Sequence, residues 1–210
     1  MVTKPASDAS CARLKVTDWI KGHDRPKAKL RPPTWTQQLA LNQVTLAERL
    51  EASPAGSESF RDTLHLGKWH LGGEGFEPEK QGFRHNLGGY FRGQPPSYFA
   101  PYGIPNLPDG AAGEYLTDRE GAEAVKFIAT NKDRSFFLNY WPYAVHTPLQ
   151  AKPELIEKYR AKAARTGGGQ TNATYAAMLE SLDTAVGRIL RALEEQGVAD
   201  RTLVVFTSDN

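Results

Sequence analysis

Lys68 and His70 have side-chain types and a spacing that could do chemistry together. They follow an alternating apolar segment, residues 60–66, that is typical of a β-strand. In extended backbone, residues two positions apart project to the same side. An ammonium and an imidazole would then point together past the strand end, with glycines on both sides to leave room for a ligand. The pattern indicates a site for a small oxyanion such as sulfate or phosphate, or else an ordinary strand exit.

Two more predicted strands also end in polar side chains. Residues 135–141 are a short apolar run of the kind found in buried strands, and the turn that follows exposes His146. Residues 202–207 have the composition of a fully buried strand and lead to Asp209 and Asn210. In open α/β sheets, ligands bind beyond the carboxyl ends of the strands. If the three predicted strands share one sheet, the polar residues that follow them converge on one site.

The chemistry of such a site would be coherent. The Asp209 carboxylate and the Asn210 amide oxygen are hard ligands that suit Ca²⁺ or Mg²⁺. Lys68, His70 and His146 could bind oxyanion oxygens and protonate a leaving group. For Asp209 and Asn210, a solvated turn after a strand is the alternative interpretation.

Periodicity and capping predict the helices that would support these strands. Residues 45–52 open with a capping box, and helices are expected over 117–129, with its first threonine as N-cap, and over 153–163. The clearest helix covers 173–196 and ends at Gly197. Its expected apolar face consists of Tyr175, Met178, Leu179, Leu182, Val186, Ile189, Leu190 and Leu193. The alternation of helix and strand favours an α/β fold whose sheet is covered on both faces.

A long segment, residues 72–113, is rich in glycine and proline with aromatic residues between them. A loop of this length without elements of its own is usually either functional or disordered. Its aromatic residues argue against disorder, because disordered segments are normally poor in them. We expect an ordered excursion that packs on the domain and lines a substrate cleft.

Composition excludes several classes of protein. A net charge of +2 among 210 residues is too small to argue for nucleic acid or an anionic membrane as partner. No run of 18 apolar residues exists, so no transmembrane segment is predicted. The single Cys11 excludes an internal disulfide framework and a cysteine-rich zinc site. The first ten residues hold no apolar stretch, so they do not read as a signal peptide.

Five short sequence motifs, taken together, resemble those of the sulfatase family of the alkaline-phosphatase-like superfamily, nearest its arylsulfatase-type bacterial members. They are VTDWI at 16–20, GKWHLG at 67–72, YAVHTP at 143–148, residues 175–190, and FTSDN at 206–210. The resemblance implies a sulfuric ester hydrolase acting on a small-molecule or carbohydrate sulfate ester. It also implies part of an alkaline-phosphatase-like mixed sheet with helices on both faces. Residues 16–210 would form a partial catalytic domain after an irregular segment, residues 1–15.

The resemblance also implies a role for each candidate residue. Lys68 resembles the lysine that binds the sulfate oxygens, and His70 resembles the histidine that hydrogen-bonds the catalytic hydroxyl. His146 resembles the histidine that contacts the ester oxygen and the sulfate. Asp209 and Asn210 resemble two ligands of the active-site Ca²⁺. The family's nucleophile is a formylglycine hydrate made from a Cys or Ser.

The departures from the family pattern concern the nucleophile and half of the metal site. Family members carry a Cys/Ser-x-Pro/Ala-x-Arg word and a pair of acidic metal ligands near the N-terminus. The only cysteine here stands in CARLK, residues 11–15, whose third residue is not Pro or Ala and whose fifth is not Arg. We expect Cys11 to be an ordinary free thiol. As an internal fragment, with an incomplete Ca²⁺ site and without the nucleophile region and C-terminal subdomain, this polypeptide should be inactive or nearly so.

Two further functions stay open at this point. The first is a non-catalytic relative that binds sulfated polyanions through Lys68, His70, His146 and the basic N-terminal segment. The second is a phosphoryl-transfer member of the same superfamily, because sulfate and phosphate have similar shapes. For localisation, the family implies a periplasmic or secreted protein.

Overall fold

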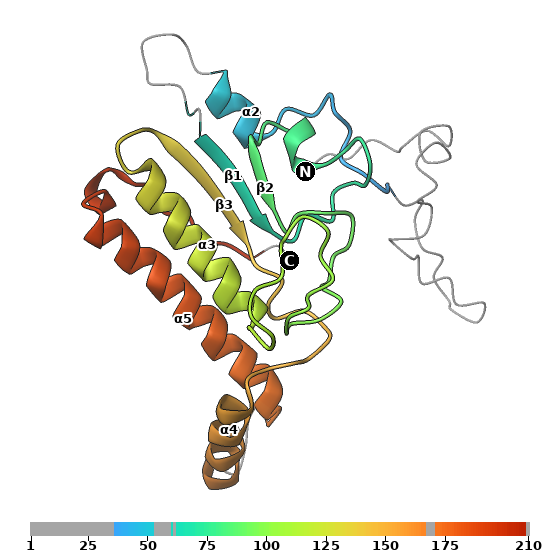
Figure 1. The fold of residues 1–210 in the computed structure, drawn as a ribbon, viewed down its shortest axis with the longest axis vertical. Coiled ribbons are helices and arrows are strands. Elements are labelled where there is room, and N and C mark those ends of the chain that lie inside the picture. Colours follow the sequence, from blue (N-terminus) through green and yellow to red (C-terminus); the bar gives the residue numbers. More distant parts are fainter. Residues whose placement is uncertain (1–35, 53–59, 61, 167–170, 209–210) are drawn as a thin grey trace, which may run out of the picture.

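The computed structural model (Figure 1) describes residues 36–52, 60, 62–166 and 171–208. Cys11, Asp209 and Asn210 lie outside the described residues. The described elements are α2 (Leu46–Glu51), β1 (Asp62–Gly67), η1 (Pro78–Lys80), β2 (His85–Leu87), α3 (Leu116–Asn131), β3 (Phe136–Trp141), α4 (Pro153–Thr166), α5 (Ala173–Glu195) and η2 (Ala199–Arg201).

Three parallel strands form the sheet, in the order β2-β1-β3. The register places Asp62 opposite Phe136 and Gly67 opposite Trp141, so β1 and β3 run side by side over their whole length. Because the strands are parallel, their carboxyl ends meet at one edge of the sheet. The predicted strands at 60–66 and 135–141 are therefore confirmed as neighbours.

Alternation along β1 assigns its side chains to two faces. Leu64 and Leu66 pack against Ala124 of α3. Helix α5 lies beside α3 (Figure 1), and its Ile189 packs in the same cluster. The side chain of His65 points to the other face. The aromatic residues gathered on that face with Ala47 of α2 are Trp69, Phe83 and Phe137. The sheet thus has helical cover on both faces, as an α/β fold requires.

Helix α5 confirms the clearest helix prediction but corrects part of its face. Asn172 caps it by accepting a hydrogen bond from the Tyr175 N–H at 3.0 Å, and Gly197 ends it with φ +67°. Leu179 and Leu190, expected in the apolar face, are 44% and 43% exposed. The buried face consists largely of smaller residues, namely Ala177, Met178, Ser181, Ala185, Ala192 and Leu193. Short side chains let α5 approach α3 closely, so the larger leucines are left at the rim.

The other helices are close to expectation. Both hydrogen bonds of the predicted capping box are present in α2, since Glu48 N–H donates to Thr45 Oγ1 and Thr45 N–H donates to Glu48 Oε2. Helix α3 starts one residue before the predicted position, with Tyr115 as N-cap, so Thr117 as N-cap was wrong. Thr117 is instead buried inside the first turn.

The predicted strand at 202–207 is wrong for this structure. Residues 202–208 form no helix or strand, and the large side chains from Leu203 to Phe206 are 55–88% exposed. An apolar strand is stable in a sheet only when a neighbour pairs with it on at least one side. Within the described part of the chain, β3 pairs only with β1. The segment keeps the composition of a buried strand without a described partner.

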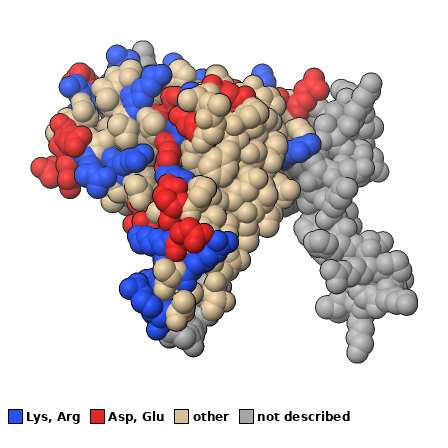
Figure 2. All heavy atoms as spheres, turned by 60° about the horizontal axis from the view of Figure 1, so that its bottom comes forward, with Lys and Arg blue, Asp and Glu red and all other residues tan. Residues whose placement is uncertain are grey.

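The long segment 72–113 is ordered, as its aromatic residues predicted. Tyr98 and Tyr102 are fully buried, and Ile104 and Leu107 lie in the same core cluster. Strand β2, which the sequence did not reveal, lies within this segment. On the face shown in Figure 2, charged side chains of both signs are interspersed beside a broad uncharged area. Among the described residues, no helix has the length and apolarity needed to cross a membrane.

Candidate functional site

The candidate site begins where β1 and β3 end side by side. Lys68 follows directly on β1, and its backbone N–H donates to the carbonyl oxygen of Trp141, the last residue of β3, at 2.6 Å. At Gly67 the chain turns with φ +99°, and a Cβ there would lie only 2.1 Å from the Trp141 carbonyl oxygen. Glycine is the residue that fits this close backbone crossing, so it fixes where Lys68 leaves the sheet.

His70 reaches the site through a turn rather than through an extended strand. Its φ is +57°, in the left-handed region, so the alternation that predicted a shared side for Lys68 and His70 does not extend to it. The His70 N–H donates to the Tyr90 carbonyl at 3.2 Å. The ring packs on Gly93, where a Cβ would lie 2.3 Å from Nδ1. The loop 88–93 therefore encloses His70 and holds its ring in place.

Lys68 and His146 both lie close enough to His70 for their charges to act on its ring. Burial lowers the pKa of His70 most, and the charges of Lys68 and then His146 lower it further. A positive charge disfavours the protonated form of a nearby histidine only at short range, from a few ångströms up to about one Debye length. The structure thus places Lys68 and His146 near His70, beyond the carboxyl ends of β1 and β3.

His146 is exposed, but its backbone is fastened. The His146 N–H donates to the Tyr143 carbonyl at 3.0 Å, closing a turn after β3. The hydroxyl of Tyr98 lies 2.7 Å from the Tyr143 carbonyl and 2.9 Å from the His146 carbonyl. In return, the Tyr143 hydroxyl donates to the Gly88 carbonyl at 2.7 Å. Two buried tyrosines thus tie the His146 turn to the loop that encloses His70.

His65, which the sequence analysis overlooked, supports the β1 exit from inside. Asn139 Nδ2 lies 3.0 Å from His65 Nδ1, and His65 Nε2 lies 3.3 Å from the Gly67 carbonyl. These partners select the tautomer with the proton on Nε2. Burial lowers the pKa of His65 to about 4, so the ring is neutral at neutral pH. Its position on the strand, in alternation with Leu64 and Leu66, was the available signal that it faces the interior.

Glu120 of α3 was also overlooked. Its side chain is fully buried, and the Tyr143 N–H donates to its Oε1 at 3.4 Å. Burial raises the pKa of Glu120 to about 8, opposed by that hydrogen bond. Spacing along α3 would have placed Glu120 on the same face as Ala124, which is the buried face.

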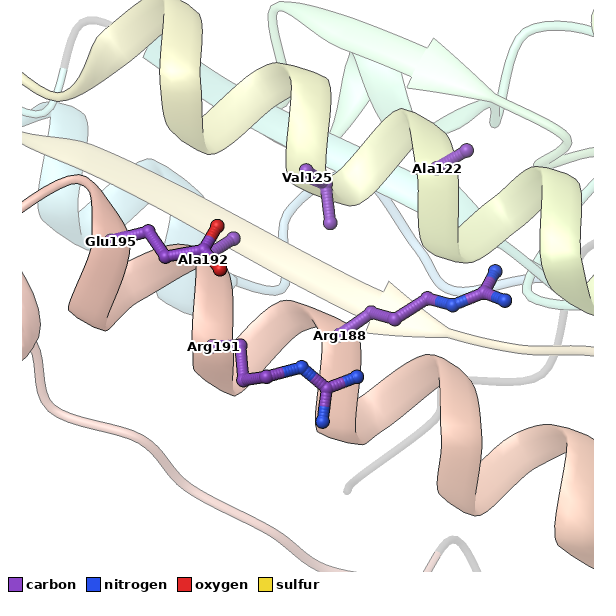
Figure 3. A pocket seen from close by; sticks show the side chains of 6 residues that line it. All are labelled: Ala122, Val125, Arg188, Arg191, Ala192 and Glu195. Atoms are coloured by element: carbon purple, nitrogen blue, oxygen red, sulfur yellow. The ribbon is translucent and has the colours of Figure 1, made fainter.

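The hollow in Figure 3 lies elsewhere. It has a volume of about 360 Å³, and its lining residues come from α3 and α5: Ala122, Val125, Arg188, Arg191, Ala192 and Glu195. None of the candidate residues lines it. The candidate site at the sheet edge is therefore separate from this groove between helices.

The described residues alone do not furnish a metal site. Among them, no group of three or more His, Cys, Asp or Glu side chains lies together in a way that could hold a metal ion. The two predicted ligands, Asp209 and Asn210, lie outside the described residues.

Known proteins resemble this chain over most of its length. The family model described as Sulfatase matches residues 62–210. A sulfatase of Formosa agariphila is 40% identical over 110 residues, covering 46% of this chain and 19% of the relative. The human N-acetylgalactosamine-6-sulfatase is 31% identical over 168 residues, covering 69% of this chain and 29% of the relative. This chain thus spans less than a third of the length of these curated relatives.

A solved structure shows the same fold. The crystal structure of yidJ from Bacteroides fragilis, described as a sulfatase, superposes with a TM-score of 0.56 at 20% identity. The match covers 78% of this chain and 42% of that one. The parallel sheet with its helices is accordingly part of an alkaline-phosphatase-like α/β fold. On the match over 62–210 and its agreement with the relatives, the chain belongs to the sulfatase family.

Proposed function

We propose that this chain forms part of a sulfuric ester hydrolase in which Lys68, His70 and His146 hold the sulfate group. The observation that supports this is that the charges of Lys68 and His146 both reach His70 beyond the carboxyl ends of β1 and β3. The lysine ammonium supplies a full positive charge, and charge-assisted hydrogen bonds to an oxyanion are the strong ones. His70, whose lowered pKa leaves it neutral at pH 7, can accept or donate a proton there.

The substrate proposed is a small-molecule or carbohydrate sulfate ester. Relatives with 30–40% identity are named N-acetylgalactosamine-6-sulfatase, arylsulfatase and steryl-sulfatase, so their names cover sugar, aryl and steroid esters. In the family, formylglycine hydrate supplies the nucleophile that attacks sulfur. The residues of this chain do not fit that group, since CARLK at 11–15 departs from its motif. We therefore assign to this chain the binding and orientation of the sulfate.

Sulfate binding is expected to depend on Lys68. Inorganic sulfate titrated into the 210-residue chain should change the fluorescence of Trp69 and Trp141, which adjoin Lys68 along the chain and through its N–H bond. Replacing Lys68 with alanine should weaken binding roughly ten- to a hundredfold, because hydrogen bonds to a charged group contribute about 1.5–3 kcal/mol. Lys126→Ala on α3, whose side chain is 76% exposed, is the matched control and should bind as the wild type does.

The same titration can contradict the proposal. Equal affinity in the wild type and Lys68→Ala would remove Lys68 from the site. Inorganic phosphate, titrated in parallel, should bind no more tightly than sulfate. A clear preference for phosphate would instead support a phosphoryl-transfer relative.

We further propose that Asp209 and Asn210 are Ca²⁺ ligands, and we expect this chain to bind Ca²⁺ only weakly. A Ca²⁺ site requires six to eight oxygen ligands, and these two residues supply a minority of them. Calorimetry should give a dissociation constant in the range of about 10⁻⁴–10⁻³ M that is typical of weak sites. Asp209→Ala should weaken it further. Micromolar affinity would mean that other residues, Asp8 and Asp18 first among them, complete the site.

A further inference from the structure

The side chain of Glu120 places a carboxyl group next to the points where the chain leaves β1 and β3. Its Oε1 accepts the 3.4 Å hydrogen bond from the Tyr143 N–H, in the turn that leads to His146. A Cβ at Gly67, the residue before Lys68, would lie 3.1 Å from the same oxygen. One fully buried carboxyl thus touches both backbone turns that carry the candidate sulfate-binding residues.

Two features of the surroundings act on the pKa of Glu120: burial raises it most, and the hydrogen bond from the Tyr143 N–H opposes that rise. The titratable groups that interact with it are Tyr98 of the long loop, Tyr115 at the N-cap of α3, Tyr140 of β3 and Tyr143 just after β3. Its second oxygen, Oε2, has no hydrogen-bond partner among the described residues. Burial of a carboxylate is costly, so the protonated form is favoured.

We propose that protonated Glu120 is a positioning residue that holds the Gly67–Lys68 turn and the Tyr143–His146 turn together for anion binding, and that its ionisation weakens this binding. The inference rests on the proposed function, because it concerns the same anion site. Two effects of Glu120 support this proposal: its carboxyl group contacts both turns, and its charge acts on the bound anion. An ionised Glu120 places a buried negative charge close to a site that binds the sulfate dianion. The two negative charges repel each other strongly, because charges in a protein interior are weakly screened.

Linkage makes the coupling reciprocal. If ionisation of Glu120 weakens sulfate binding, bound sulfate must by the same factor hold the proton on Glu120. The group with a pKa of about 8 therefore titrates at a higher pH in the sulfate complex than in the free protein. Each pKa unit of this difference corresponds to tenfold in affinity.

The test compares the wild type with Glu120→Gln between pH 6.5 and 9.5, using inorganic sulfate and the tryptophan fluorescence titration. The wild-type dissociation constant should rise by about tenfold across this range, as one pKa unit of coupling requires. Glutamine keeps the shape and the acceptor for the Tyr143 N–H but cannot ionise, so its binding should lose this slope. Glu123→Gln, one turn along α3 and paired with Arg119, is the matched control and should keep the wild-type slope.

Two measurements keep the test decisive if Glu120→Gln folds poorly. The infrared band of a protonated carboxylic acid should be present in the wild type at pH 6.5 and lost by pH 9.5. Sulfate added near pH 8 should restore it. Equal pH slopes in the wild type and Glu120→Gln, or no response of the band to sulfate, would overturn the inference. Failure of the wild type to bind sulfate at any pH would remove the proposed function as well.

Thermal stability gives an independent check on the proton. The folded pKa of about 8 exceeds the ordinary value of 4.5, so the native state binds the proton more tightly than the unfolded state does. The stabilisation is therefore complete below pH 4.5 and is lost as the pH rises through 8. Relative to Glu120→Gln, the wild type should lose melting temperature between pH 5 and 8. A constant difference would show that Glu120 is already ionised at pH 5.

Discussion

The purified 210-residue chain is expected to show no measurable turnover of an aryl sulfate, even after co-expression with a formylglycine-generating enzyme. No Cys or Ser in the sequence is followed by Pro or Ala two positions later and by Arg four positions later. Sulfate binding by itself does not accelerate the reaction unless it strengthens in the transition state. Loss of the nucleophile in an enzyme with covalent catalysis costs on the order of 10⁴–10⁶-fold in rate.

Intact-mass measurement supplies the control for this result. It should find Cys11 as an unconverted thiol under conditions in which a known substrate of the generating enzyme is converted. Turnover that disappears in Cys11→Ala would show instead that CARLK is a functional site. Sulfate binding without turnover is the combination that the proposed role of Lys68, His70 and His146 predicts.

Gly67→Ala is expected to destabilise the fold by more than about 4 kcal/mol, a loss comparable to the whole stability of many domains. The new Cβ would lie 2.1 Å from the carbonyl oxygen of Trp141, and both atoms belong to rigid, hydrogen-bonded backbone. The φ of +99° adds strain of its own. Urea denaturation followed by circular dichroism would measure the change.

Gly113→Ala separates the two contributions. Gly113 has a similar φ of +81°, but nothing lies within 4 Å of the position that its Cβ would take. This variant should therefore cost only the left-handed backbone penalty, about 1–2 kcal/mol. Equal losses in the two variants would mean that the approach of Gly67 to Trp141 is not a tight one.

Local sequence signals predicted the elements that depend on local interactions. The capping box of α2 and the glycine after α5 were read correctly because a cap is made by residues three or four positions apart. Strands at 60–66 and 135–141 followed from short apolar runs. The segment 202–207 has the same composition and forms no strand here, because pairing depends on a neighbour that the sequence pattern does not reveal. Strand β2 was missed for the complementary reason, since its three residues are mostly polar.

The residues of the candidate site also fall into two groups, those that local sequence signals revealed and those that they did not. Lys68 and His70 could be identified from the sequence because they belong to one short motif. His146 could be identified because it follows a predicted strand. Their approach in space depends on the parallel register of β1 and β3, which only the structure gives. Glu120 and His65 were missed because their burial is decided by residues far away in the sequence. For Glu120 these are Gly67 and Tyr143.

The tyrosines that fasten the long loop have a consequence for how this scaffold could be redesigned. The Tyr98 and Tyr143 hydroxyls tie the loop to the His146 turn, and the Tyr115 hydroxyl donates to the Gln150 carbonyl at 2.8 Å. All three rings are buried, whereas residues such as Arg92 and Gln94 are exposed. The exposed part of the loop can therefore be replaced while the buried tyrosines keep the loop in position. An engineer can vary its exposed rim in a library, provided that the three tyrosines stay in place.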